Sequence, residues 1–268
     1  TVRGRIPTVF VPHAWSHLAL PGPAKPIAIA WERSAARWTN AVVAVGAAEA
    51  SEGVRRHVRA PMFLVRNPVP PGWHFATTQD RSIAREALDL PQGAPIVTCV
   101  GRFSRQKGQD SLIDAWSVVS KELPDARLLL VGDGPTGDDL RNRAPATVIF
   151  TGATNDPRPF LAACDVAALP SRWEGLSLSM LEAMASGRSV VTTAVAGSEV
   201  VADSDCGAVV PVDEPQAFAR ALLPRLSGLI EADVEGRRGH QYVIDHHDFD
   251  TQMARFAAVI SRAHAFGR

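Results

Sequence analysis

Neither sign of charge is in excess in this sequence, whose 28 lysines and arginines balance 28 aspartates and glutamates over 268 residues. Such a surface gives no general attraction to nucleic acid or anionic lipid, so any anion site must be local. Cysteine is scarce, and Cys99, Cys164 and Cys206 lack the spacing of a zinc site or a disulfide framework. We expect three buried thiols in a reducing compartment. No apolar run reaches the roughly 18–20 residues of a membrane span, and no signal peptide is visible.

The composition, with 46% hydrophobic and 21% charged residues, is typical of a soluble globular protein and argues against disorder. The length suits one large domain or two modest ones. Because the chain begins at Thr1 and enters an apolar strand almost at once, we expect a further N-terminal segment upstream.

Short β-branched and apolar runs alternate with longer segments of helical period. Predicted helices include residues 111–122, 177–186 and 215–226, and predicted strands lie at 8–11, 41–45, 62–65, 96–100, 127–131, 148–150, 166–169, 189–193 and 208–210. This alternation predicts parallel sheets with helices on both faces. The strands are apolar throughout, as strands buried on both sides should be.

One segment, residues 67–72, has four chain breakers in six residues and predicts an interdomain linker. We therefore expect residues 1–68 to be the end of one domain and residues 69–247 to be a complete second domain. Residues 248–268 should form a final helix, whose apolar face would present Met253, Phe256, Val259 and Ile260.

A cationic loop follows the strand at 96–100. Arg102 and Lys107 come after Gly101 and before a predicted helix, at the carboxyl end of the strand, where doubly wound sheets bind ligands. An arginine fork and a lysine point charge suit a diphosphate, although a surface loop with solvated cations fits this segment equally well. A later strand ends in a second glycine turn, Gly132-Asp133-Gly134-Pro135. Its glycines would let a ring or a phosphate come close to the backbone, but the segment also fits an ordinary turn.

The most informative segment spans residues 170–187. Its loop carries Glu174, and a helix begins just after it, with hydroxyl residues available as a cap. Glu182 lies about one and a half turns into that helix. The positive end of the helix, which suits a phosphate, is formed by the free amides near Gly175, Leu176 and Ser177.

Two carboxylates beside a bound diphosphate are repelled unless they accept hydrogen bonds from hydroxyl groups. A nucleotide-sugar offers two such sets, on the sugar and on the ribose. Glu174 and Glu182 would otherwise be an ordinary loop acid and a solvated helix acid. The interpretation of Glu182 as a solvated helix acid is weakened by its apolar neighbours, Leu178, Leu181, Met184 and Ala185.

The segment resembles the E-x7-E motif of retaining GT-B glycosyltransferases, family 4 in particular, with Glu174 and Glu182 as its two acids. The surrounding motifs agree in order over residues 96–226. They resemble the family's G-R…K-G phosphate loop, G-x-G-P turn and G-x-x-E turn, at Gly101-Arg102 with Lys107-Gly108, Gly132-Asp133-Gly134-Pro135 and Gly197-Ser198-Glu199. Residues 8–13, 41–50 and 67–70 resemble later parts of the family's N-terminal domain and its linker less tightly, since Gly46 replaces a usual serine.

The resemblance implies an α/β fold of GT-B type, with Rossmann-like doubly wound parallel sheets in one complete domain and one partial domain. It implies transfer of a sugar, of hexosyl type, from a UDP-, GDP- or ADP-sugar to an acceptor hydroxyl with retention of configuration. Catalysis would fall to Glu174, His13, Arg102 and Lys107, with Glu174 on the donor sugar and His13 facing it across the cleft. Further donor contacts would come from Gly101, Gly132, Asp133, Gly134, Arg172, Gly175, Leu176, Ser177 and, on the ribose, Glu182.

Arg102, Lys107 and the helix amides would stabilise the leaving diphosphate, so no metal or other cofactor is expected. The acceptor would be a sugar, a lipid-linked sugar or a small molecule, and nucleic acid is not an expected partner. A cytoplasmic location is implied, with peripheral contact at the inner face of the membrane through the N-terminal domain as an option.

Two other functions fit the same motifs. The short N-terminal portion would suit an inactive or truncated nucleotide-sugar-binding module, because such a domain usually needs on the order of 100–200 residues. Another GT-B enzyme, such as a non-hydrolysing nucleotide-sugar epimerase or a disaccharide phosphorylase, is disfavoured by the family 4 motif order.

Several conspicuous residues receive plainer interpretations. We interpret Asp203-Ser204-Asp205 as a solvated turn rather than a D-x-D metal signature, and residues 246–248 as a connection between helices rather than metal ligands. Four tryptophans lie in or near the first part of the chain, Trp15, Trp31, Trp38 and Trp73. We expect them to pack in the core or between domains rather than to face a membrane surface.

Overall fold

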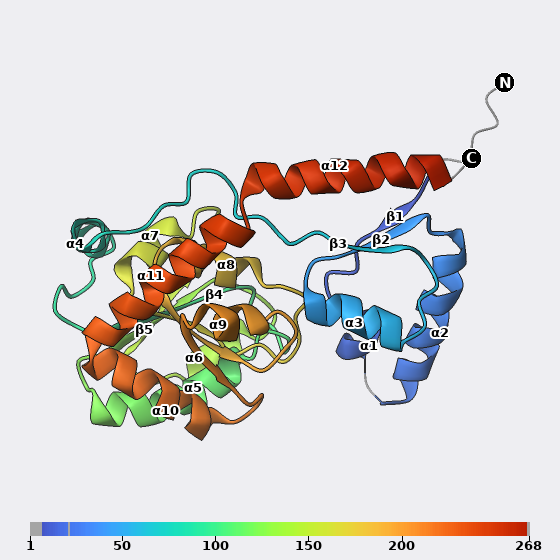
Figure 1. Cartoon of the computed structure of the whole chain (residues 1–268). Helices are drawn as coiled ribbons and strands as arrows, with labels where there is room; N and C mark the ends of the chain where they lie inside the picture. The colour runs from blue at the N-terminus through green and yellow to red at the C-terminus, as the bar shows by residue number, and fades with distance from the viewer. Residues whose placement is uncertain (1–6, 21, 267–268) are drawn as a thin grey trace.

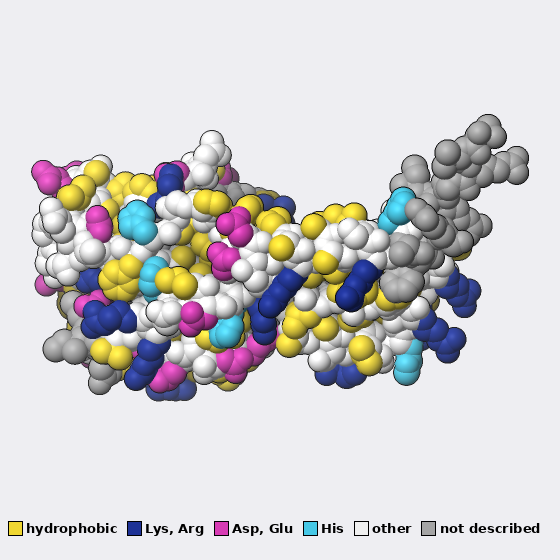
Figure 2. Space-filling view, turned by 45° about the horizontal axis from the view of Figure 1, so that its top comes forward, with side chains coloured by type: hydrophobic (Ala, Val, Ile, Leu, Met, Phe, Trp, Pro, Cys, Tyr) yellow, Lys and Arg dark blue, Asp and Glu magenta, His cyan; other side chains and the backbone are white. Residues whose placement is uncertain are grey.

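The computed structural model describes residues 7–20 and 22–266, which form two lobes joined by a narrow waist (Figures 1 and 2). The smaller lobe contains a parallel sheet in the order β1 (Val9–Phe10), β2 (Ala41–Ala44) and β3 (Met62–Leu64). Its helical segments are α1 (Ser16–Ala19), η1 (Gly22–Ala24), α2 (Lys25–Ala35), η2 (Ala36–Trp38) and α3 (Ala47–Arg55).

The larger lobe is built on a parallel sheet of order β6-β5-β4-β7-β8-β9. Its strands are β4 (Ile96–Val100), β5 (Arg127–Val131), β6 (Val148–Gly152), β7 (Val166–Leu169), β8 (Ser189–Thr193) and β9 (Gly207–Val210). The order reverses between β4 and β7, and ligands of doubly wound sheets bind at the carboxyl edge of such a switch point.

Helices cover both faces of this sheet. One face packs against α4 (Thr78–Ala87), α7 (Arg158–Ala163), α8 (Leu178–Ala185), α9 (Glu199–Ser204) and α11 (Leu229–His246). The other packs against α5 (Gln109–Glu122), α6 (Gly137–Arg143) and α10 (Pro215–Ser227). Neighbouring residues of β4 and β5 alternate between the two cores, as the strand period requires. The predicted fold class, doubly wound parallel α/β, is confirmed.

Two segments of the described chain cross the waist. The segment after β3 leads from the smaller lobe to α4, and α12 (Phe249–Phe266) runs back from the larger lobe along the smaller one (Figure 1). Val259 and Ala263 of α12 are buried against Ala41 and Val43 of β2. The inward stripe of α12 differs from the predicted one, because Met253 and Ile260 are exposed while Gln252, Phe256, Val259 and Ala263 face inward.

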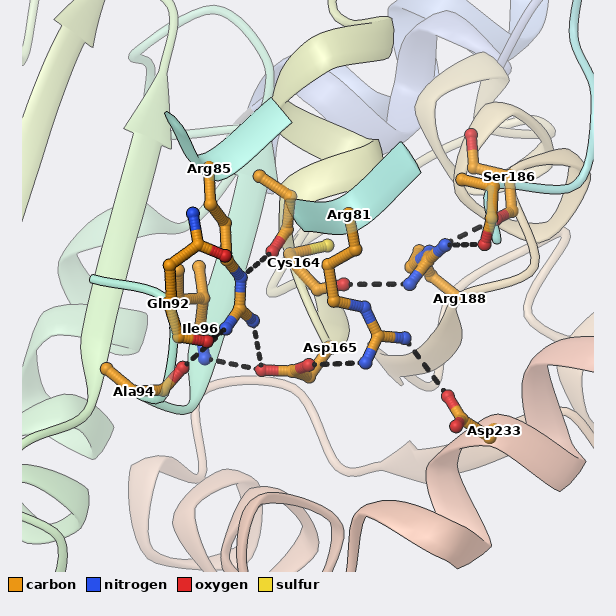
Figure 3. A network of polar contacts seen from close by, with 12 residues as sticks. Arg81, Arg85, Gln92, Ala94, Ile96, Cys164, Asp165, Ser186, Arg188 and Asp233 are labelled. Carbon is orange, nitrogen blue, oxygen red and sulfur yellow. Dashed lines mark hydrogen bonds and ion pairs between the residues drawn. The ribbon is translucent and has the colours of Figure 1, made fainter. Parts of the chain in front are cut away.

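A buried polar network fixes α4 to the amino ends of β4 and β7 (Figure 3). Asp165 accepts hydrogen bonds from Arg85 Nη2 at 2.9 Å and from the Ile96 amide at 2.8 Å. Arg81 Nη1 lies 3.1 Å from the other Asp165 oxygen, and Arg188 Nη1 donates to the Cys164 carbonyl at 3.0 Å. This network lies at the edge of the sheet opposite the switch point, so we assign it to stability.

The tryptophan prediction is partly wrong. Trp15 is 2% exposed and Trp73 packs beside the core, but Trp31 and Trp38 are 69% and 70% exposed. Helix α2 buries only Ala28 and Glu32, which lie one turn apart on its inner face, so Trp31 falls on the outer face.

The expectation of buried cysteine thiols is confirmed, and the other conspicuous residues lie at the ends of helices. The three cysteines are free and buried, and Asp203 and Asp205 are exposed around the end of α9. Residues 247–248 connect α11 to α12. Among the described residues, no helix is long and apolar enough to cross a membrane, and no three metal-ligating side chains cluster.

Candidate nucleotide-sugar site

The loop after β4 is held by two glycines that no other residue could replace without strain. Gly108 has a φ of +66°, and a Cβ on it would lie 2.1 Å from the Pro170 carbonyl oxygen. Gly132, after β5, has a φ of +146°, and its Cβ would lie 2.1 Å from the Gly101 oxygen. The loop after β4 therefore touches the loops after β7 and β5 backbone to backbone.

The turn after β5 supports the cationic loop directly. The Asp133 carbonyl accepts from the Phe103 amide at 2.8 Å, and Asp133 Oδ1 accepts from the Gly134 amide at 2.7 Å. A Cβ on Gly134 would collide with Phe103. These contacts leave the Arg102 side chain exposed above the carboxyl end of β4. Asp133 and the two turn glycines thus shape the floor of the site.

Lys107 and Glu174, both predicted as catalytic, lie together. Lys107 Nζ is 2.6 Å from Glu174 Oε1, and Ser171 Oγ donates to the same oxygen at 2.8 Å. Glu174 is 9% exposed. A charge-assisted bond of this kind holds the lysine ammonium and the carboxylate at defined positions, and sequence reasoning missed the contribution of Ser171.

The amino end of α8 presents free donors beside this pair. Ser177 is its N-cap residue but makes no side-chain capping bond, and its hydroxyl pairs with Ser179 instead. Within the described residues, the amides of Gly175, Leu176 and Ser177 have no protein acceptor. Such amides at the positive end of a helix suit a phosphate.

Glu182 lies on α8, with its side chain half-buried. Burial raises the pKa of its carboxyl above the usual value, and no side chain of the described part of the chain is paired with it. A desolvated carboxylate gains from hydroxyl donors, as the hydroxyls of a ribose would supply.

His13 approaches the site from the smaller lobe. It is exposed on the loop after β1, where its φ is +47° and that of Ala14 is +88°. Glu49 fixes this loop, because its carboxylate accepts from the Ala14 amide at 2.6 Å and from the Val45 amide at 2.8 Å. A Cβ on Gly175 would lie 2.8 Å from the Ala14 nitrogen, so this loop touches the loop of Glu174.

A cavity of about 480 Å³ lies between the lobes at this point. Glu49, Glu52 and Arg55 of α3 line one side, and Trp173 and Glu174 line the other. Further contacts across the waist come from Asn67, whose amide donates to the Leu176 carbonyl at 2.9 Å. Asn67 was read from the sequence only as part of a linker, because nothing local indicates a partner 109 residues away.

Arg172, a predicted donor-binding residue, makes most of its side-chain contacts to other protein groups. Its guanidinium bonds to Asp110, to Asp213 and to the Arg105 carbonyl. Lys107 and Glu174 meet at the switch point, and the backbone of His13 lies against the loop of Glu174 at Gly175.

A doubly wound parallel sheet with a cationic loop, a free helix amino end and Glu174 at its switch point has the fold of a GT-B glycosyltransferase domain. The fold agrees with solved structures. Sucrose-phosphate synthase from Thermosynechococcus elongatus matches with a TM-score of 0.82 and 23% identity over 96% of this chain and 68% of that one. HepE from Anabaena, solved in complex with UDP-glucose, matches with a TM-score of 0.84 and 23% identity over 95% and 72%.

The chain belongs to the family described as glycosyl transferases group 1, whose model matches residues 94–227. The lipopolysaccharide core biosynthesis glycosyltransferase LpsE of Rhizobium meliloti is 34% identical over 169 residues, which cover 61% of this chain and 48% of that protein. A GDP-mannose-dependent phosphatidylinositol monomannoside mannosyltransferase of Mycolicibacterium smegmatis is 33% identical over 212 residues, covering 72% and 55%. The chain thus spans about half the length of these relatives.

Proposed function

We propose that this chain carries the donor site of a retaining, family 4 glycosyltransferase of hexosyl type. It would move a sugar from a nucleoside diphosphate sugar to an acceptor hydroxyl. The observation that carries the proposal is the Lys107–Glu174 pair beside the free amides of α8. Farther along the same helix lies Glu182, which pairs with no side chain that the structure describes. A diphosphate fits the lysine and the amides, and hydroxyl groups fit the two carboxylates.

The reaction breaks the bond between the anomeric carbon and the diphosphate oxygen, so negative charge grows on the leaving group. Arg102, Lys107 and the α8 amides stabilise that charge in place of a metal ion, which can lower a barrier by several kcal/mol. Binding of the diphosphate releases Glu174 from Lys107 toward the hydroxyls of the donor sugar. His13, on the opposite loop, contacts the sugar from the acceptor side.

The acceptor we propose is a sugar or a lipid-linked sugar. LpsE is named for lipopolysaccharide core biosynthesis, and the mycolicibacterial relative for a phosphatidylinositol monomannoside. We place the protein in the cytoplasm, in peripheral contact with the inner face of the membrane when the acceptor is lipid-linked. The nucleotide is UDP, GDP or ADP.

Calorimetry of the whole chain with these three nucleotides tests the site. One nucleotide should bind, and Glu182→Ala should weaken it by about tenfold or more, since lost hydrogen bonds to a carboxylate cost about 1.5–3 kcal/mol. Glu174→Ala should leave binding nearly intact and lower turnover, which should persist in EDTA. Binding of none of the three would refute the donor site. Binding without transfer from any nucleotide-sugar would favour a binding module, the second candidate.

A further inference from the structure

The loop that carries Glu174 is bound to the cationic loop by backbone as well as by the Lys107 pair. The Arg172 amide donates to the Gln106 carbonyl at 2.7 Å. Gln106 Nε2 returns a bond to the Trp173 carbonyl at 3.1 Å. The residues that directly precede Lys107 and Glu174 are therefore hydrogen-bonded to each other.

Arg172 anchors this junction to the rest of the lobe. Its Nη1 and Nη2 donate to the two oxygens of Asp110 at 2.9 Å and 2.8 Å, a bidentate pair with the first turn of α5. Nη1 also donates to the Arg105 carbonyl at 2.9 Å, and Nε donates to Asp213 at 2.8 Å. The Arg172 side chain is 16% exposed, against 39% for Asp110 and 54% for Asp213.

The charge state of Asp110 agrees with this anchoring. Burial by itself raises the pKa of its carboxyl, but the hydrogen bonds and the charge of Arg172 outweigh burial and hold that pKa below its usual value. These bonds use four of the N–H donors of the guanidinium and leave one for any ligand.

We propose that Arg172 is a positioning residue, not a donor ligand: with Asp110 it sets the geometry of Lys107 and Glu174. The kinetic test of this inference, a change in kcat, rests on the proposed function. The structural test, the labelling of Lys107, does not. A planar fork fixed to a carboxylate holds direction as well as distance, which a lysine at the same place does not. Misplacement of a reacting group by about 1 Å can cost on the order of a hundredfold in rate.

The kinetic test is a double-mutant cycle of Arg172→Lys and Asp110→Asn in the whole chain. Each single variant should lower kcat by about tenfold or more. The Kd of the nucleoside diphosphate should stay within about threefold, because Arg102 and the α8 amides still bind the phosphates while Lys107 is displaced but retained. The double variant should be no worse than the worse single one, since both remove the same bidentate pair. Asp213→Asn, the matched control, removes the more exposed partner and should leave kcat close to the wild-type value.

A second measurement stands without any transfer activity. The sequence has three lysines, Lys25, Lys107 and Lys121, so acetylation of each amine can be followed by mass spectrometry, with exposed Lys121 as the reference. In Arg172→Lys the peptide of Lys107 remains distinct, and Lys107 should react roughly threefold faster or more as its pair with Glu174 opens. Asp110→Asn should give the same increase.

Two results would overturn the proposal. One is a Kd that rises about tenfold in Arg172→Lys but not in Asp110→Asn, which would make Arg172 a ligand of the diphosphate. The other is unchanged Lys107 labelling in both variants, which would show that the Arg172–Asp110 pair does not position Lys107 and Glu174. If wild-type protein transfers no sugar while the labelling changes as expected, the proposed function fails and the positioning role stands.

Discussion

His247 makes stability depend on pH in a way that can be calculated from its surroundings. The residue is 0% exposed at the corner between α11 and α12. Its Nδ1 lies 2.8 Å from the Asn67 carbonyl, which can only accept, so Nδ1 carries the proton of the neutral ring. Nε2 is buried without a hydrogen-bond partner in the described part of the chain.

Burial lowers the pKa of His247 to about 4 from the usual 6.5, with smaller lowering contributions from Arg66 and His246, and the Asn67 bond opposes them. Because the folded pKa is the lower one, the unfolded chain takes up a proton first as pH falls. The stability is therefore complete above about pH 6.5 and is lost progressively down to about pH 4. At about pH 4.5 the loss amounts to about 2.5 kcal/mol relative to about pH 8.

The assay is urea unfolding, followed by circular dichroism, at several values between about pH 8 and about pH 4.5. His247→Asn is the comparison, since its amide can replace the Nδ1 donor but does not titrate. The free energy of unfolding of wild type should fall by about 2.5 kcal/mol more than that of the variant over this range. The difference cancels other titrating groups, such as Glu52, whose pKa lies near 2. Parallel curves would refute a buried neutral His247.

Two further predictions concern stability and use thermal unfolding as the measurement. Asp165→Asn should destabilise the fold by about 3–5 kcal/mol, because Arg85 would keep a buried charge without its counterion. Asp233→Asn, at the 44% exposed rim of the same network, should cost less than about 1 kcal/mol. Equal losses would show that burial does not set the strength of these pairs. Gly132→Ala should destabilise the fold by about 1–3 kcal/mol, because its Cβ would lie 2.1 Å from the Gly101 oxygen. Gly93→Ala is the control and should be nearly neutral, since a Cβ there meets nothing within 4 Å. An unchanged Tm in Gly132→Ala would contradict the close loop contact.

The sequence by itself was sufficient for the central strands of the larger lobe. Four strands, β4, β5, β7 and β8, have the predicted bounds, because buried parallel strands are continuous apolar runs that need no information from elsewhere in the chain. The spacing of Glu174 and Glu182 was likewise local, since one loop and one helix carry both residues.

The smaller lobe shows where local pattern fails. Tryptophan is a good core residue by type, yet Trp31 and Trp38 lie on surfaces that nothing in the described residues covers. The stripe of α12 was also misplaced, because Gln252 turns inward to donate to the His246 carbonyl at 2.9 Å, and no periodicity of apolar residues can signal a buried amide.

The sequence determined which residues lie at the carboxyl edge of the sheet, since strand ends and glycine turns are local features. Only the tertiary structure decided what those residues do to one another. Lys107 and Glu174 are 67 positions apart, and Arg172 and Asp110 are 62 apart. Asn67 and His247, the pair that ties the two crossings of the waist together, are 180 apart. Partners so distant are chosen by the packing of whole elements, because a short polar side chain carries no local signal of the group that it will meet.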